Sequence, residues 1–185
     1  MIKENIFELT IDLVFKFESL KLKNIVYDNK DNLIFEKHFW KKIFEIWMNI
    51  ILREKIFSNL SNFKLNRPNF SLSFEIIDDE LIADLNKKWL NKKGSTDVLS
   101  FPIIYENDLL IEMPCIELGD IFISIETAQK QANHFNNTLR KEMIWLASHG
   151  FLHLLGWDHR NENELEKMLN FQEYLISKLN GEYEI

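Results

Sequence analysis

The sequence predicts a single α+β domain spanning residues 1–185, with a small mixed sheet and about four to five helices. Three observations support this prediction. A length of 185 residues fits one domain, no repeat or Gly/Pro-rich linker divides the chain, and strand-like and helical segments follow one another in irregular order. With 46% hydrophobic and 13% aromatic residues, the chain can build a core without disulfide bonds.

Two strands and a long helix are expected in the first part of the chain. Apolar and polar residues alternate in Ile6–Phe17 and in Phe70–Ile77, and this period of two is typical of strands with one buried face. Apolar residues recur at helical spacing in Phe35–Phe57, which predicts an amphipathic helix. Polar residues indicate a turn at Asn29–Asn32 and a loop at Asn59–Asn69.

A capped helix, a turn and a short strand follow. The pair Asp78–Asp79 provides capping carboxylates for a helix that we expect to end near Leu90. Asn91–Ser95 is typical of a turn, and Asp97–Phe101 of a strand that is ended by Pro102.

The remainder of the chain is mostly helical. Tyr105–Cys115 lacks a regular pattern and is interpreted as a hairpin or an insertion, whereas Gly119–Ser124 is expected to form a fourth strand. Three helices are expected after that strand, and they cover Glu126–Phe135, the strongly apolar Thr138–Leu155 and the amphipathic Asn161–Leu179.

Composition excludes several classes of function. Cys115 is the only cysteine, so the chain cannot form an internal disulfide or a multi-cysteine zinc finger. The five glycines are too dispersed for a phosphate-binding loop. No signal peptide or membrane-spanning run is evident, which predicts a cytoplasmic protein without a membrane partner. The net charge of −7 argues against indiscriminate nucleic-acid binding but leaves room for a local basic groove.

Three of the five histidines lie close together near the end of the apolar helix. His149 and His153 are four residues apart, so on a helix they face the same side and can share a metal ion. Gly156 can end the helix in a left-handed conformation and turn the chain back, which brings His159 to the same ion. Three protein ligands leave a fourth position for water, as in catalytic zinc sites. The segment therefore predicts a zincin-like metal-binding helix that holds one zinc ion per chain.

The spacing His-x-x-x-His-x-x-Gly-x-x-His is that of the metzincin metalloproteases, with one difference. Those enzymes place a glutamate general base directly after the first histidine, and Gly150 occupies that position here. Glycine cannot take up a proton, which disfavours a peptidase. Asp158 is the carboxylate nearest to His159 in the sequence, and it is a base, a partner of a metal ligand, or a turn residue. We treat His149 and Asp158 as candidate catalytic residues.

Three blocks of sequence, His149–His159, Thr96–Pro102 and Leu118–Ile121, together resemble the signature of the YbeY family of bacterial endoribonucleases. The blocks are specific because each is several residues long and all three occur in one chain. Single matches extend the resemblance over residues 70–179, namely Leu85, Asn86, Glu142, Leu146, Met168 and Gln172.

The resemblance implies an α+β fold and a zinc ion held by the residues that match His149, His153 and His159. It implies metal-dependent cleavage of single-stranded RNA, in 3′-end maturation of the small-subunit ribosomal RNA and in ribosome quality control. The implied partners are single-stranded ribosomal RNA and the small ribosomal subunit, and not DNA. The family usually carries an arginine at the position that aligns with Leu90, and leucine cannot clamp a phosphate as a guanidinium does.

Two alternative functions remain beside a nuclease in which metal-activated water attacks phosphorus. A non-catalytic ribosome-assembly or RNA-binding factor with a structural metal is favoured by the leucine at position 90. A metallopeptidase is the other alternative, and Gly150 weighs against it.

Basic and polar residues beside the Thr96 block are candidate substrate ligands. Lys92 and Lys93 belong to a basic patch that begins in the preceding helix, and this patch either follows an RNA backbone or is a solvated surface. Thr96, Asp97 and Ser100 either line a cleft beside the metal or serve as turn and capping residues.

Aromatic residues, the other histidines and the cysteine offer weaker candidates. Trp89 and Trp157 either stack on RNA bases or lie in the core or at its rim. His38 and His134 are expected at the surface and not among the metal ligands, and Cys115 is expected in an irregular loop without a role.

Overall fold

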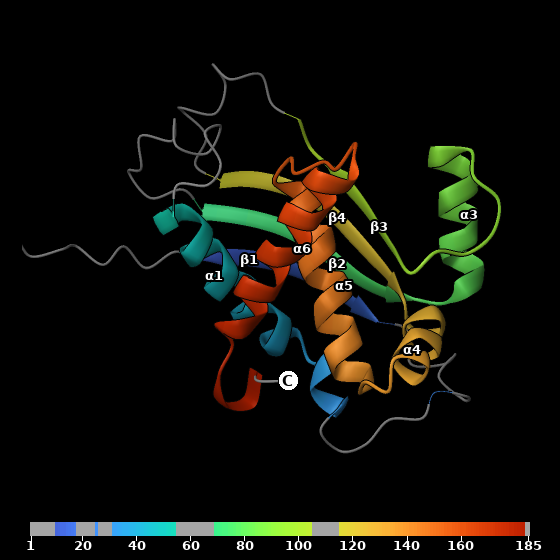
Figure 1. The fold of residues 1–185 in the computed structure, drawn as a ribbon, viewed down its shortest axis with the longest axis horizontal. Coiled ribbons are helices and arrows are strands. Elements are labelled where there is room, and N and C mark those ends of the chain that lie inside the picture. The colour runs from blue at the N-terminus through green and yellow to red at the C-terminus, as the bar shows by residue number, and fades with distance from the viewer. Residues whose placement is uncertain (1–9, 18–24, 26–30, 55–68, 105–114, 184–185) are drawn as a thin grey trace, which may run out of the picture.

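The computed structural model describes residues 10–17, 25, 31–54, 69–104 and 115–183 (Figure 1). These residues form five α-helices and a four-stranded mixed sheet, which confirms the α+β prediction. The elements are β1 (Ile11–Phe17), α1 (Lys37–Glu54), β2 (Asn69–Ile77), α3 (Asp79–Leu90), β3 (Val98–Pro102), β4 (Cys115–Ser124), α4 (Ile125–His134), α5 (Leu139–Leu154) and α6 (Glu162–Ser177), with short 3-10 helices at Asp31–Phe35 and Gly181–Tyr183.

The sheet has the strand order β1-β2-β4-β3. Strands β1, β2 and β4 are parallel, whereas β3 runs antiparallel to β4 and forms one edge of the sheet. The parallel pairs are connected through helices, as parallel strands require. The short antiparallel strand therefore lies at the edge of a parallel core, where α5 packs on it (Figure 1).

Strand β4 begins at Cys115 and not at Gly119, where the sequence pattern placed its start. The pairing with β2 shifts by one residue at Leu118–Gly119, so the strand continues through a β-bulge. Gly119 has φ 123°, and a Cβ there would lie 2.1 Å from the carbonyl oxygen of Phe101. Glycine marks a bulge here and not a strand end, and Cys115 lies in the sheet and not in an irregular loop.

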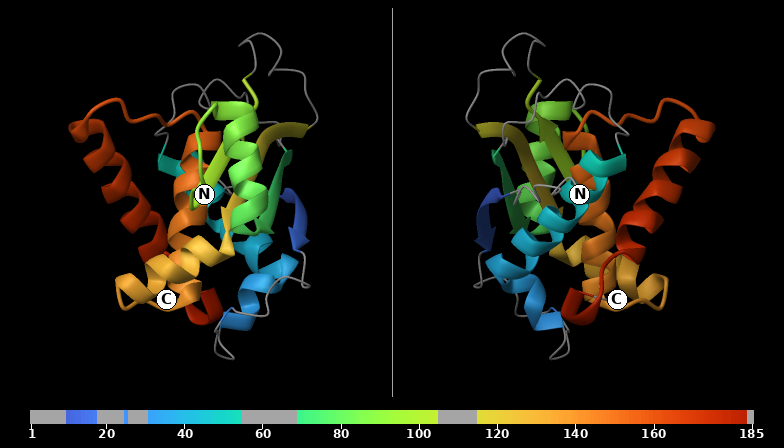
Figure 2. Two further views of the ribbon diagram at one scale, coloured as in Figure 1. Left: turned by 90° about the vertical axis from the view of Figure 1, so that its right-hand side faces the viewer. Right: turned by 90° about the vertical axis from the view of Figure 1, so that its left-hand side faces the viewer.

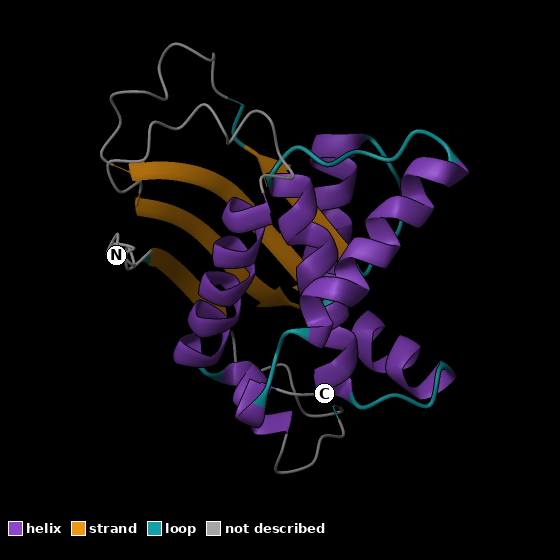
Figure 3. Cartoon of the chain, turned by 60° about the vertical axis from the view of Figure 1, so that its left-hand side comes forward, coloured by secondary structure: helices purple, strands orange, loops and turns teal. Residues whose placement is uncertain are grey.

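Helices α1 and α5 cover one face of the twisted sheet and build the main core (Figure 3). An aromatic cluster joins the three layers, because rings from α1, β2 and α5 pack with centroids 4.5–6.0 Å apart. Its members are Trp40, Phe44, Trp47, Phe74 and Phe151, all fully buried. Helix α6 packs on α5, outermost from the sheet (Figure 2). Within the described ranges no helix combines the length and apolar character needed to cross a bilayer.

Helix α3 packs on the opposite face of the sheet, over β3 and β4, in a small second core around Ile82 and Leu99. The Asp79 carboxylate joins α3 to α4, since it accepts hydrogen bonds from Thr127 Oγ1 at 2.6 Å and Lys130 Nζ at 2.7 Å. Burial opposes ionisation of Asp79, but these donors outweigh it and hold the pKa of the carboxyl below its usual value. The N-terminal end of α3 is thereby fixed to α4.

The predicted elements agree with the structure apart from their ends. The strand expected at Ile6–Phe17 is described only from residue 10, and the helix expected at Phe35–Phe57 runs from Lys37 to Glu54, beyond which residues 55–68 lie outside the described ranges. The hairpin or insertion expected at Tyr105–Cys115 also lies outside them, except for its last residue.

Candidate functional site

The three predicted histidines meet at the C-terminal end of α5. The Nε2 atoms of His149 and His153 are 3.1 Å apart, and ligand nitrogens of these two residues and of His159 all lie within 4.8 Å of one another. Nitrogen ligands at 2.0–2.1 Å from a tetrahedral zinc ion lie about 3.3 Å apart. The cluster therefore has the size and the donor chemistry to hold one metal ion.

A glycine-containing helix cap brings His159 to the other two histidines. Gly156 has φ 86°, its N–H donates to the carbonyl of His153 at 2.9 Å, and the Trp157 N–H donates to the carbonyl of Leu152 at 3.0 Å. This pair of hydrogen bonds is the Schellman motif, in which a left-handed residue ends a helix and reverses the chain. The structure confirms the predicted role of Gly156.

Gln172, from the buried side of α6, orients His149. Its Oε1 atom lies 2.9 Å from His149 Nδ1, and its Nε2 atom donates to the carbonyl of Trp145 at 3.2 Å and to Ser148 Oγ at 3.1 Å. Because the Gln172 amide nitrogen donates to both of these acceptors, Oε1 is the atom that accepts from His149, and His149 Nδ1 carries the proton. The Nε2 lone pair of His149 is then directed to the cluster, as metal binding requires.

Sequence reasoning missed this contact, although Gln172 was matched to the family. The available signal was its position between Met168 and Leu175, which are both fully buried on α6. A glutamine within an apolar stripe is expected to have a specific buried partner.

Burial lowers the pKa of His149 and of His153, because the charged imidazolium loses its hydration there. The neighbouring His159 lowers both pKa values further. The two imidazoles are therefore neutral near pH 7, which is the form that binds metals.

A cleft of about 930 Å³ extends from the histidines across β3 to the C-terminal end of α3. Four of the five predicted substrate ligands line it, namely Lys92, Thr96, Asp97 and Ser100, whereas Lys93 is not among its lining residues. The structure thus gathers residues from α3, β3 and α5 around one open space.

Both carboxylate oxygens of Asp97 have partners. Oδ1 accepts hydrogen bonds from the Val98 N–H at 2.8 Å and from Thr96 Oγ1 at 3.0 Å, and Oδ2 accepts one from Gln131 Nε2 at 2.9 Å. These contacts correspond to the turn and capping alternative, and they tie the start of β3 to α4.

Asp158 lies in the exposed loop that carries His159. Its Oδ2 lies 3.2 Å from Arg160 Nε and its Oδ1 accepts from the His159 N–H at 2.9 Å. The Arg160 guanidinium, followed by the His159 N–H, lowers the pKa of the Asp158 carboxyl. A carboxylate with a lowered pKa is a weaker base, so the contacts match the turn alternative, and a catalytic role stays a prediction.

Gly150, in place of the metzincin glutamate, faces β3. A Cβ at this position would lie 2.9 Å from Ser100 Oγ, 3.0 Å from Ile121 Cγ2 and 3.3 Å from Val98 Cγ2. The glycine therefore allows α5 to approach β3 closely and leaves no room for a glutamate side chain.

The two candidate tryptophans occupy different positions. Trp157 lines the cleft and stacks on Phe171 with centroids 5.4 Å apart, whereas Trp89 is 60% exposed, contacts Phe101 and is not among the cleft-lining residues. Leu90 lines the cleft and is 46% exposed, so an aliphatic side chain occupies the position at which the resemblance leads us to expect an arginine. His38 and His134 are exposed, as expected.

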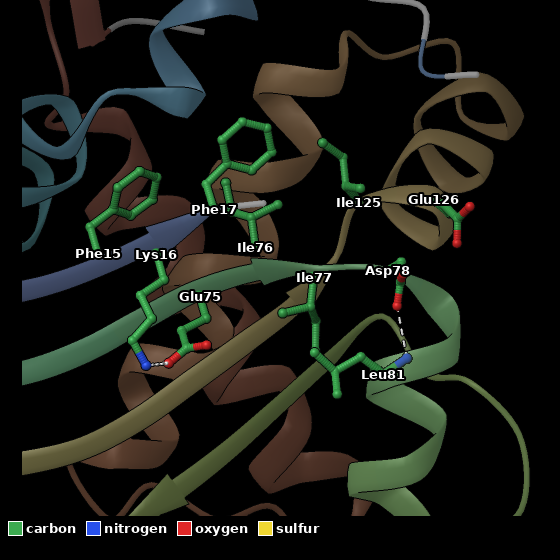
Figure 4. Close-up of a pocket in the computed structure, with 10 residues that line it drawn as sticks. All are labelled: Phe15, Lys16, Phe17, Glu75, Ile76, Ile77, Asp78, Leu81, Ile125 and Glu126. Atoms are coloured by element: carbon green, nitrogen blue, oxygen red, sulfur yellow. Dashed lines mark hydrogen bonds and ion pairs between the residues drawn. The ribbon is translucent and has the colours of Figure 1, made fainter. Parts of the chain in front are cut away.

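A second hollow, of about 390 Å³, lies at the carboxyl ends of β1 and β2 (Figure 4). The polar side chains around it have partners: Lys16 Nζ lies 2.7 Å from Glu75 Oε1, and Asp78 accepts a hydrogen bond from the Leu81 N–H at 2.8 Å. The groups capable of chemistry are therefore concentrated in the histidine cleft.

The family model and the curated relatives agree on one family. The family model described as "Endoribonuclease YbeY" matches residues 26–180. The relative of the same name from Prochlorococcus marinus subsp. pastoris (strain CCMP1986 / NIES-2087 / MED4) is 54% identical over 180 residues, covering 97% of this chain and 99% of the relative. The Endoribonuclease YbeY of Prochlorococcus marinus (strain MIT 9215) is 52% identical with the same coverage. The solution structure of TM1509 from Thermotoga maritima is 22% identical, covers 91% of both chains and has a TM-score of 0.45.

Proposed function

The chain belongs to the YbeY endoribonuclease family, and we propose that it is a zinc-dependent endoribonuclease specific for single-stranded ribosomal RNA. The observation that carries the proposal is the cluster of three imidazoles in an open cleft that also contains a lysine. Neutral imidazoles with no carboxylate among the three ligands suit zinc better than magnesium or calcium.

His149, His153 and His159 would hold the ion. When bound, zinc supplies an activated water and stabilises negative charge on the phosphate. Gln172 keeps the proton of His149 on Nδ1, so the Nε2 atom stays available for the ion. Asp158 holds the main chain of His159 through its N–H, and thereby fixes the third ligand.

The substrate side of the cleft is proposed to be the β3 side. Lys92, assisted by Lys93, binds the phosphate backbone, and Thr96 and Ser100 contribute hydroxyl groups. Asp97 is proposed to position β3 beside the substrate, since its carboxylate already binds the neighbouring main chain. An unpaired strand suits this cleft because its nucleotides can bend around a single metal centre.

Membership in the family supports the cellular part of the proposal. We propose that the protein acts in 3′-end maturation of the small-subunit ribosomal RNA and in ribosome quality control. The small ribosomal subunit is then its partner and the cytoplasm its location.

The test is cleavage of labelled RNA by purified protein with zinc, with and without a chelator. We expect unpaired RNA to be cut faster than duplex RNA, and the chelator to stop cleavage. His153→Ala should lose both metal and activity, whereas the exposed His134 provides a matched histidine-to-alanine control. Stoichiometric zinc without cleavage would favour the ribosome-assembly alternative, and faster cleavage of casein than of RNA would favour the peptidase.

A further inference from the structure

The outer edge of β3 lies along the cleft, and its main chain carries chemistry of its own. Within the described ranges β3 pairs only with β4, on its other side. Four residues of β3 line the cleft, namely Val98, Leu99, Ser100 and Pro102. The side chains of Val98, Ser100 and Pro102 alternate with those of Leu99 and Phe101. The latter two belong to the second core and face away from α5.

The register shows which main-chain groups point to the open edge. The Ser124 N–H donates to the Asp97 carbonyl at 2.8 Å, and at the other end the Ile103 N–H donates to the carbonyl of Leu118 at 3.1 Å. In an antiparallel ladder every second residue bonds to the partner strand. The residues between these, whose main-chain groups point away from β4, are Val98, Ser100 and Pro102.

Two of the three residues on this open edge have no main-chain N–H available to a ligand. The Val98 N–H donates to the Asp97 carboxylate at 2.8 Å, and Pro102 has no N–H. The edge therefore presents three carbonyl acceptors and a single N–H donor, that of Ser100. Such an edge is a poor template for another strand, which needs donors and acceptors in alternation.

An edge of carbonyls selects its ligand by charge and by donors. Phosphate oxygens are repelled by carbonyl oxygens, since both carry partial or full negative charge. Hydroxyl groups donate to carbonyls readily. The 2′-hydroxyl is the donor that RNA has at every nucleotide and DNA lacks.

We propose that the carbonyls of Val98, Ser100 and Pro102 accept hydrogen bonds from 2′-hydroxyls of the bound strand, and that the enzyme thereby selects RNA over DNA. This inference rests on the proposed function, because it concerns the same cleft. The sugars lie against β3, which leaves the phosphates to Lys92 and to the histidine cluster. Neighbouring carbonyls on this edge are about 7 Å apart, so each contacts a different nucleotide.

The test measures binding to metal-free protein, in the presence of a chelator, so that cleavage does not interfere. The probes are a short fluorescent oligouridine and versions in which one nucleotide at a time is 2′-deoxy or 2′-fluoro. We expect each substitution at a contacted nucleotide to weaken binding about fivefold, the usual size of one net hydrogen bond. The 2′-fluoro group keeps an RNA-like sugar conformation but cannot donate, so both substitutions should weaken binding equally.

Equal affinity for oligouridine and oligodeoxyuridine would overturn the inference, as would a 2′-fluoro strand that binds like RNA. Failure of the inference and of the proposed function are separable. Cleavage with zinc but no 2′-hydroxyl effect contradicts only the former, and a 2′-hydroxyl effect without cleavage contradicts only the latter. No measurable RNA binding together with no cleavage in the presence of zinc would overturn both.

A second measurement locates the contact on the protein. With carbonyl carbons labelled by ¹³C, oligouridine should shift the resonances of Val98 and Ser100 more than oligodeoxyuridine does. The carbonyl of Leu99 provides the internal control, because it faces β4 in the same strand. Shifts confined to Leu99, or equal for both oligonucleotides, would contradict the assignment.

Discussion

The hydrogen bond from His149 to Gln172 determines how strongly α6 supports the metal centre. Gln172→Leu keeps a side chain of similar size in a fully buried position but removes the oxygen 2.9 Å from His149 Nδ1. It also removes the amide nitrogen that lies 3.1 Å from Ser148 Oγ. Without the acceptor, the ring can rotate or move its proton to Nε2, where the metal would bind.

The expected magnitude follows from that one contact. Loss of the partner of a metal-bound imidazole weakens metal binding by about 10- to 100-fold, or about 1.4–2.7 kcal/mol. Leaving a buried polar group unpaired costs about 1–3 kcal/mol, a range that agrees. We therefore expect the zinc Kd of Gln172→Leu to rise about 10- to 100-fold, and the metal-free protein to unfold at a lower temperature, by roughly 2–4 °C for each kcal/mol.

The assay is competition for zinc with a chromophoric chelator, at a temperature where circular dichroism shows every variant folded. Gln172→Glu keeps an acceptor for His149 and should retain the wild-type affinity. Gln129→Leu is the matched control, because Gln129 pairs with Asn133 on α4 and does not contact the histidines. Wild-type zinc affinity in folded Gln172→Leu would refute the reasoning.

Four other substitutions have effects whose sign the structure determines. Gly119→Ala should lower the free energy of unfolding in urea by about 2–5 kcal/mol, because the backbone has a positive φ there and the new Cβ would meet the carbonyl of Phe101. Gly94→Ala is the control: it also has a positive φ but open space around it, so it should lose only the smaller part of that free energy, which is due to φ. In Gly150→Ala, the new Cβ would lie 2.9 Å from Ser100 and 3.3 Å from Val98 of β3, at a cost of about 1–3 kcal/mol, whereas the better helix propensity of alanine contributes about 1 kcal/mol. Urea denaturation should therefore show a free energy of unfolding that is lower by at most about 2 kcal/mol. A variant more stable than wild type would contradict the close packing. Burial raises the pKa of Glu142 above its usual 4.5, so its charge destabilises the fold as pH rises. Glu142→Gln should be more stable than wild type at pH 7 in urea denaturation, and the difference should shrink as pH falls through the raised pKa towards 4.5. Leu90→Arg should raise the RNA cleavage rate about 10- to 150-fold by supplying a phosphate clamp, and an unchanged rate would show that position 90 does not reach the phosphate.

Features that depend on local hydrogen bonds were predictable from the sequence. Asp78 accepts from the Leu81 N–H at 2.8 Å and caps α3, and Asn161 accepts from the Glu164 N–H at 3.0 Å and caps α6. The histidine cluster belongs to the same class, since a helical spacing of four and a Gly156 turn specify it within one short segment.

Features that depend on distant pairing were not predictable. Gln172 is 23 residues from His149, and the contact exists only because α6 folds back on α5. The sequence pattern places a strand start at Gly119, because glycine weakens a strand interior. The strand continues through Gly119 only because its partner β2 accommodates a bulge there. The bond from Gln131 to Asp97 likewise requires α4 to pack beside β3.

Gly150 links the packing of the cleft to its charge. Because a Cβ there would already approach Ser100 Oγ to 2.9 Å, a glutamate could enter only by displacing β3, the strand that lines the cleft. Close packing of α5 on β3 and the absence of a carboxylate directly after His149 therefore follow from one residue. The carboxylates among the described lining residues are Asp97, occupied by three donors, and Asp158, paired with Arg160. Both carboxylates of the cleft are bound to donors, and Lys92 lies in its wall. The cleft is therefore better suited to a polyanion than to a peptide, because peptide hydrolysis of the metzincin kind needs a free carboxylate to activate water.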